Sequence, residues 1–93
     1  FVDSLVGQIV DILDASGLRD DTLVLLTSDH GEMMGEHGLW WKSCFLEEAA
    51  RVPMICRWPS RLPAGERRNN VLSLVDVFPT ILDAAGISIP GLA

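Results

Sequence analysis

The sequence lacks several features that define common protein classes. Its 93 residues hold only 7 Lys and Arg against 13 Asp and Glu, so the basic patch that nucleic-acid binding requires is absent. The only two cysteines, Cys44 and Cys56, form no C-x-x-C pair, which argues against a disulfide framework. No apolar run approaches the ~20 residues of a membrane-spanning helix. We therefore expect neither a nucleic acid nor a membrane among its partners.

The composition that remains is that of a globular protein. Hydrophobic residues make up 48% of the chain and charged residues 22%, which is too apolar for a disordered tail. It is also apolar for a free-standing domain of this size, so we expect some apolar surface to pack against chain N-terminal to these residues. The sequence begins at Phe1, inside a predicted helix, and we do not expect this to be the native start; the lack of a signal peptide therefore carries no weight.

The hydrophobic pattern predicts an α/β arrangement. Apolar residues at steps of three and four favour a helix over residues 2–16. The apolar run that follows favours a strand over residues 22–28, buried on both faces as in a parallel sheet. A helix followed closely by such a strand is typical of α/β proteins. The remaining prediction, for a single domain, is a loop at 29–46 that carries the active site, a strand at 52–58 and a helix at 76–85.

Asp29 and His30 lie just past the end of the first predicted strand, where ligands bind in open α/β sheets. A carboxylate and a neutral imidazole are both ligands for divalent cations. Gly31 would allow the chain to turn, so that both side chains face one ion. An ordinary turn in which Asp29 bonds its own backbone explains these residues as well. Two ligands do not complete a metal site, so the remainder must come from elsewhere.

Three residues of the following loop are further candidates for the site. Lys42 offers a point charge suited to a sulfate or phosphate oxygen, although a lysine is more often a solvated surface charge. Trp41 could stack on a substrate, or it could serve packing as tryptophans usually do. His37 could bind a ligand or substrate, or be purely structural. No G-x-S-x-G nucleophile motif surrounds Ser28.

These pieces resemble the sulfatase family of the alkaline-phosphatase superfamily over roughly residues 2–90. Asp-His-Gly alone is a weak signal, whereas the ordered series of matches is specific. The matching segments are Asp21–Val24, Thr27–Glu32, Gly35–Trp40, Lys42, Glu48, Arg51–Ile55, Trp58-Pro59, Ser73–Leu82, Ala85–Ile87 and Pro90.

The resemblance implies a fold and a reaction. The fold is a three-layer α/β/α architecture around a largely parallel sheet, of which this chain would be the C-terminal part. The reaction is metal-dependent hydrolysis of sulfate esters by a formylglycine made from Cys or Ser in a C/S-x-P-S/T-x-R motif. That motif is absent here, since Cys56 and Cys44 stand in different contexts. We expect the formylglycine outside this chain, and no turnover from residues 1–93 alone.

The resemblance also assigns roles within the site. Asp29 matches a metal ligand, His30 matches the neighbouring position where the family carries Asn or His, and Lys42 matches a lysine that contacts the sulfate group. We expect Ca²⁺, with Mn²⁺ or Zn²⁺ as alternatives. His37 and Trp41 are expected near the substrate. Two other functions stay open: a phosphonate or phosphate monoester hydrolase of the same superfamily, and a non-catalytic domain that binds through Trp40 and Trp41.

Overall fold

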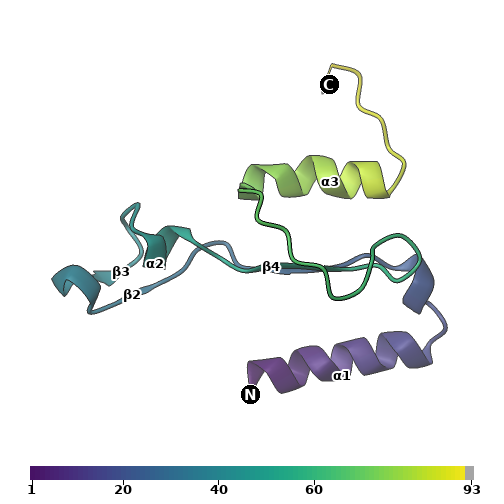
Figure 1. Cartoon of the computed structure of the whole chain (residues 1–93), viewed down its shortest axis with the longest axis horizontal. Coiled ribbons are helices and arrows are strands. Elements are labelled where there is room, and N and C mark those ends of the chain that lie inside the picture. The colour runs from purple at the N-terminus through teal and green to yellow at the C-terminus, as the bar shows by residue number, and fades with distance from the viewer. Residues whose placement is uncertain (92–93) are drawn as a thin grey trace.

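A computed structural model describes residues 1–91. Its longest elements are two helices, α1 (Val2–Ala15) and α3 (Val77–Ala84), and two strands, β1 (Val24–Thr27) and β4 (Met54–Arg57). The strand pair lies between the two helices, so the chain forms three layers in the order helix, sheet, helix (Figure 1). This arrangement is that of a part of a three-layer α/β/α fold.

The two helices begin and end close to the residues expected from the pattern. Helix α1 ends at Ala15, one residue before the predicted end at 16, and Gly17 has a φ of 77°. This left-handed conformation suits glycine at the end of a helix. Helix α3 begins at Val77 instead of 76, and the Asp76 carboxylate accepts a hydrogen bond from the Ser73 N–H at 2.8 Å. Asp76 thus closes the turn that precedes the helix.

Strands β1 and β4 form an antiparallel pair in which Val24 faces Arg57 and Thr27 faces Met54. Both are shorter than the predicted 22–28 and 52–58. We expected the first strand to have parallel neighbours, but β4 runs antiparallel to it. We also expected both faces of this strand to be buried, and residues 1–91 do not bury them. Leu26 and Ile55 keep 39% and 57% of their surface exposed, because no other described segment covers them.

The segment expected to be a loop at 29–46 contains a small hairpin. Strands β2 (Met33–Met34) and β3 (Trp40–Trp41) pair antiparallel, and a 3₁₀ turn, Glu36–Gly38, joins them. A short helix, α2 (Glu47–Ala50), follows and leads into β4. Together these elements extend to one side of the strand pair (Figure 1).

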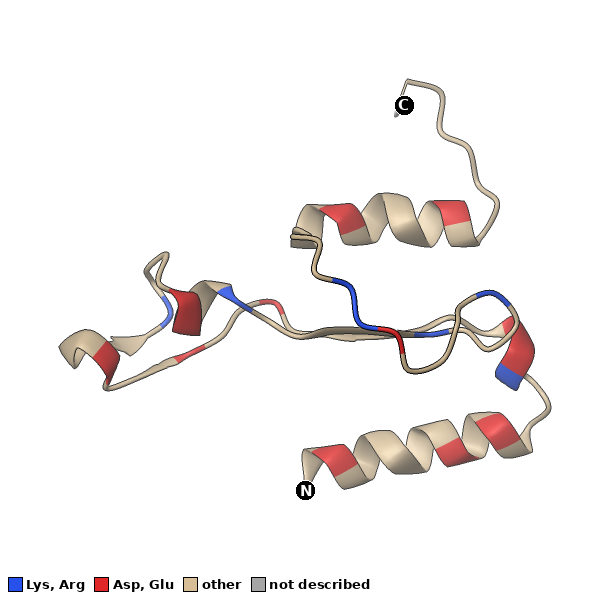
Figure 2. Ribbon diagram, in the orientation of Figure 1, with Lys and Arg blue, Asp and Glu red and all other residues tan. Residues whose placement is uncertain are grey.

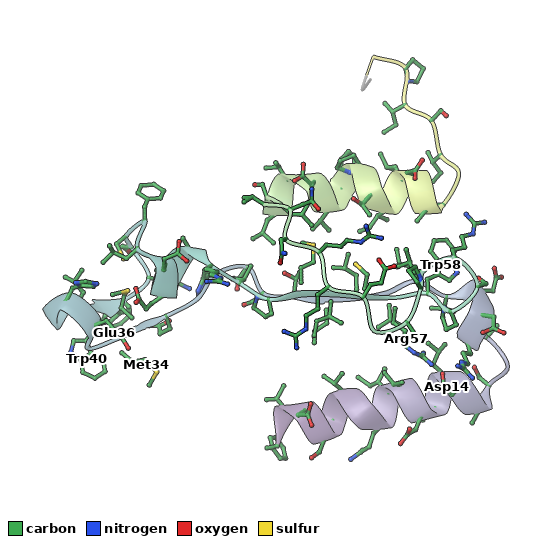
Figure 3. All side chains as sticks on the ribbon, viewed as in Figure 1. Asp14, Met34, Glu36, Trp40, Arg57 and Trp58 are labelled. Atoms are coloured by element: carbon green, nitrogen blue, oxygen red, sulfur yellow. The ribbon has the colours of Figure 1, made fainter. Side chains whose placement is uncertain are left out.

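An ion pair ties α1 to the sheet. Nη2 of Arg57 on β4 donates to both carboxylate oxygens of Asp14, at 2.6 and 2.8 Å, and the two side chains point toward one another in Figure 3. Nearby, the Trp58 indole donates to the Asp20 carbonyl at 3.1 Å. These polar contacts fix the turn between α1 and β1 against the far end of β4.

The described chain has little core of its own. Its radius of gyration is 16.3 Å, whereas a compact chain of this length has about 12 Å. Only Met33 and Ala49 are buried, at 1% and 3% exposure, among the residues described. Apolar side chains of both outer helices, such as Ile12 and Phe78, remain exposed. None of the described helices has the length and hydropathy needed to cross a membrane.

Candidate functional site

Asp29 and His30 occupy a tight turn just after β1. The His30 N–H donates to Asp29 Oδ1 at 3.0 Å, and the Ser28 hydroxyl donates to the His30 carbonyl at 2.8 Å. The turn explanation of these residues therefore accounts for one carboxylate oxygen. The other, Oδ2, lies 3.4 Å from Nε2 of the His30 ring. Asp29 therefore takes part in the turn through one oxygen and faces the His30 ring with the other.

The contacts of the His30 ring define its tautomer. Nδ1 lies 2.7 Å from the Gly31 carbonyl oxygen, which can only accept, so Nδ1 carries the proton. Nε2 contacts the Lys42 ammonium group, which can only donate, so Nε2 accepts. With Nδ1 as the donor and Nε2 as the acceptor, the ring is a neutral imidazole whose Nε2 faces Lys42. That is the state in which histidine binds a metal.

The separation of the two facing atoms fits one cation. Ligand atoms about 2.1 Å and 2.4 Å from an ion, and about 90° apart, lie roughly 3.2 Å from each other. The distance between Asp29 Oδ2 and His30 Nε2 is 3.4 Å. No group of three or more potential His, Cys, Asp or Glu ligands occurs within residues 1–91. The described residues therefore offer two candidate ligands, Asp29 and His30.

The Asp29 carboxyl is held in its charged form. Desolvation raises its pKa. The electrostatic effect of His30, the His30 N–H and the Lys42 charge together lower it by more, so the pKa is below the ordinary 3.8. The side chain is 84% exposed. Asp29 is consequently an accessible anion at neutral pH, as a cation ligand must be.

The hairpin carries Lys42 back to the end of β1. Lys42 follows β3 directly, and Trp41 before it has a φ of 78°, in the left-handed region. That backbone bend turns the chain so that the Lys42 ammonium group reaches His30, twelve residues earlier. Lys42 is the only Lys or Arg between residues 29 and 50, which contain five acidic residues; Figure 2 shows how the basic and acidic positions are distributed along the ribbon.

The structure does not bring every predicted residue together. His37 lies in the 3₁₀ turn at the hairpin tip with a φ of 55°, and no hydrogen bond or ion pair of the described chain joins its side chain to Asp29, His30 or Lys42. Trp41 is adjacent to Lys42 and 73% exposed. Trp40 is 66% exposed, and its ring lies against Gly35, where a Cβ would be 3.7 Å from it.

Two contacts of the site were not predicted from the sequence. The Glu36 carboxylate accepts from the Met34 N–H at 2.6 Å and closes the hairpin turn (Figure 3). The Gly31 N–H donates to the Ala49 carbonyl at 2.8 Å, which docks the turn on α2. The first contact is local, within two residues, whereas the second joins Gly31 to a distant residue, and no motif in the sequence marked either of them.

A carboxylate, an imidazole and an ammonium group thus lie at the end of a strand in a part of a three-layer α/β/α fold. Comparison with known proteins gives the family. The family model described as Sulfatase matches residues 1–87. The chain belongs to the sulfatase family.

Individual relatives agree with the family assignment. The chain is 44% identical over 89 residues to the choline-sulfatase of Rhizobium meliloti (strain 1021), covering 96% of this chain and 17% of that protein. It is 40% identical over 88 residues to arylsulfatase K of Xenopus laevis, covering 95% and 16%. A solved structure of a protein in complex with its substrate D-glucosamine-2-N,6-O-disulfate superposes with a TM-score of 0.89 at 37% identity, covering 98% of this chain and 18% of that one. The chain thus spans about a sixth of the length of these relatives.

Proposed function

We propose that the full-length protein hydrolyses sulfate esters, and that residues 1–93 supply two metal ligands and a sulfate contact to its active site. The observation that carries this proposal is that His30 Nε2, just after β1, lies 3.4 Å from Asp29 Oδ2 and contacts the Lys42 ammonium group. The family of the chain supports the reaction, and the geometry supports the assignment of these residues.

Asp29 and His30 hold the cation in this proposal. Asp29 contributes an ionised oxygen, and His30 contributes Nε2, where a bound cation would take the place of the Lys42 contact seen here. When bound, a divalent cation supplies positive charge that polarises the sulfate group and orients the nucleophile. Ca²⁺ is our first expectation because oxygen ligands complete such sites, with Mn²⁺ or Zn²⁺ if nitrogen ligands are added.

Lys42 neutralises negative charge on a non-bridging sulfate oxygen. Its ammonium group contacts His30, and it is the only Lys or Arg between residues 29 and 50, so it is the basic group of this segment that can meet an anion. A donor aimed at charge that develops in the transition state is typically worth a large rate factor. We therefore assign Lys42 both substrate binding and catalysis.

Trp41 and His37 line the approach to the sulfate group in this proposal. Trp41 combines a left-handed backbone with an exposed indole. This backbone conformation costs free energy for a bulky residue, and packing within the described chain does not offset that cost. Contact with the alcohol part of the ester supplies a reason. His37 at the hairpin tip also has a left-handed backbone, and reaches the substrate only through movement of the hairpin or a large substrate.

The same proposal predicts that residues 1–93 alone give no turnover. They contain no C/S-x-P-S/T-x-R motif for a formylglycine, so the nucleophile has to come from chain beyond them. Their exposed apolar faces on α1 and α3 would pack against that part of the domain. An aryl sulfate assay on the isolated 93 residues with added Ca²⁺ or Mn²⁺ should show no product, while the full-length protein should.

Matched substrates test the reaction itself. The full-length protein should hydrolyse an aryl sulfate faster than the corresponding aryl phosphonate or phosphate, with activity lost on chelation. Preference for the phosphonate or phosphate would replace the proposal with a related hydrolase of the superfamily. Absence of both activities, together with no cation binding by calorimetry, would leave a binding domain.

A further inference from the structure

Gly31 differs from the other glycines of this chain in the reason why it must be glycine. Its φ is not in the left-handed region, whereas six others are: Gly17, Gly35, Gly38, Gly65, Gly86 and Gly91. A Cβ on Gly31 would instead lie 2.0 Å from the Glu48 carbonyl oxygen and 3.0 Å from its carbonyl carbon. The requirement is therefore for space, since the backbone of α2 occupies the place of a side chain.

The N–H and the carbonyl of Gly31 both form hydrogen bonds, one with α2 and the other with His30. Its N–H donates to the Ala49 carbonyl of α2 at 2.8 Å, and its carbonyl accepts the Nδ1 proton of His30 at 2.7 Å. The α2 end of this link is well packed, because Ala49 is only 3% exposed. An unbroken chain of contacts thus runs from a buried helix residue to the imidazole ring.

We propose that Gly31 is a positioning residue that sets the tautomer and orientation of His30. By docking on α2, it holds its carbonyl where Nδ1–H can donate to it, and this leaves Nε2 on the side of Asp29 Oδ2 and Lys42. The inference rests on the proposed function, in which Nε2 meets a cation, and adds the element that orients it. Groups that bond the second nitrogen of a metal-binding histidine commonly act in this way.

The mechanism requires close contact, so the smallest enlargement should break it. Gly31→Ala places a methyl group against a backbone carbonyl, which cannot rotate away as a side chain can. The turn has to move off α2, and the carbonyl of residue 31 moves with it. The His30 ring then loses its fixed Nδ1 partner, although Asp29, His30 and Lys42 are all unchanged.

The test uses full-length protein labelled with ¹⁵N-histidine, free of metal, above the ordinary histidine pKa of ~6.5. The His30 signals are assigned by their loss in His30→Gln. The unmodified protein should carry the proton on Nδ1, whereas Gly31→Ala should show a mixture of tautomers. Calorimetry with Mn²⁺ should give a Kd raised about 10- to 100-fold in Gly31→Ala. Gly7→Ala, at a helix position with open space around it, should change the Kd less than about twofold.

Each outcome decides the matter. A proton on Nε2 in the unmodified protein would overturn the inference, whether or not Gly31→Ala folds. A folded Gly31→Ala with the same tautomer and Kd would overturn it as well. Should that variant not fold, Ala49→Leu, which overfills the buried α2 position, should shift the tautomer in the same sense. If Nδ1 carries the proton but the protein neither binds cations nor cleaves sulfate esters, the proposed function fails while the positioning of His30 stands.

Discussion

The ammonium group of Lys42 contacts Nε2 of His30, the nitrogen that carries the lone pair of the ring. The two residues are twelve positions apart, and the β2–β3 hairpin between them turns the chain back to make the contact. The contact places a positive charge next to the nitrogen that we propose as a metal ligand. In the proposed function, the Lys42 charge and the bound cation together neutralise the sulfate anion.

Lys42→Met should lower kcat/KM for an aryl sulfate by about 10²- to 10³-fold, because it removes a donor to charge that develops on the sulfate group. Steady-state kinetics of the full-length protein would measure this. Arg67→Met, which removes a cation from a loop outside the hairpin, should leave kcat/KM within about twofold. Equal losses in both variants would assign the effect to net charge and contradict a specific role of Lys42.

Asp29→Asn should weaken cation binding by at least about 10-fold, since it removes the anionic ligand but keeps the shape of the turn. Calorimetric titration with Ca²⁺ and Mn²⁺ gives the Kd directly, without reliance on activity. Asp11→Asn, on an exposed face of α1, is the matched control. Unchanged affinity in Asp29→Asn would exclude this carboxylate from the metal site.

Trp41→Leu should raise KM for sulfate esters with large alcohol groups several-fold and change kcat little, because its exposed indole is proposed to contact the leaving group. Trp40→Leu provides the comparison, since Trp40 packs on Gly35 and should affect stability more than KM. Chemical denaturation alongside kinetics separates the two. The reverse pattern would move the substrate contact from Trp41 to Trp40.

Glu36 gives the hairpin a sensitivity to acid. The Met34 N–H that donates to its carboxylate lowers its pKa below the ordinary 4.5. Since the pKa is lower in the folded state, the contact stabilises the hairpin fully above pH 4.5 and is lost as the pH falls through the lowered value. Carboxyl ¹³C NMR should follow the titration at that lower pH. Glu36→Gln should remove this acid response, and Glu32→Gln should retain it; a Glu36 midpoint at or above 4.5 would contradict the contact.

The ion pair between Asp14 and Arg57 should contribute about 1 kcal/mol to the free energy of unfolding, because only one guanidinium nitrogen contacts the carboxylate and solvent partly screens the charges. The side chains are 38% and 28% exposed. Urea denaturation of Asp14→Asn, Arg57→Met and the double variant forms a thermodynamic cycle. A coupling energy near zero would mean that apolar contacts alone hold α1 to the sheet, and Asp3→Asn controls for charge on the helix.

The sequence by itself determined the local elements and the family. Apolar residues at helical spacing outline α1 and α3, the run before Thr27 outlines β1, and the Asp29-His30-Gly31 motif with Lys42 downstream indicates the chemistry. These signals are local or ordered along the chain, so each can be read without knowing where distant residues lie. The shorter strands reflect how few residues of each run find a hydrogen-bonded partner.

The tertiary structure alone decided the antiparallel pairing of β1 with β4, the hairpin within the expected loop, and the reason for Gly31. A pattern of alternating or continuous apolar residues does not reveal the direction of a neighbouring strand. Gly31 was predicted to serve a turn, yet its role is the close approach of α2. This contact depends on where the hairpin between them places the backbone of Glu48 and Ala49. A steric contact between two distant segments cannot be read from the sequence of either segment alone.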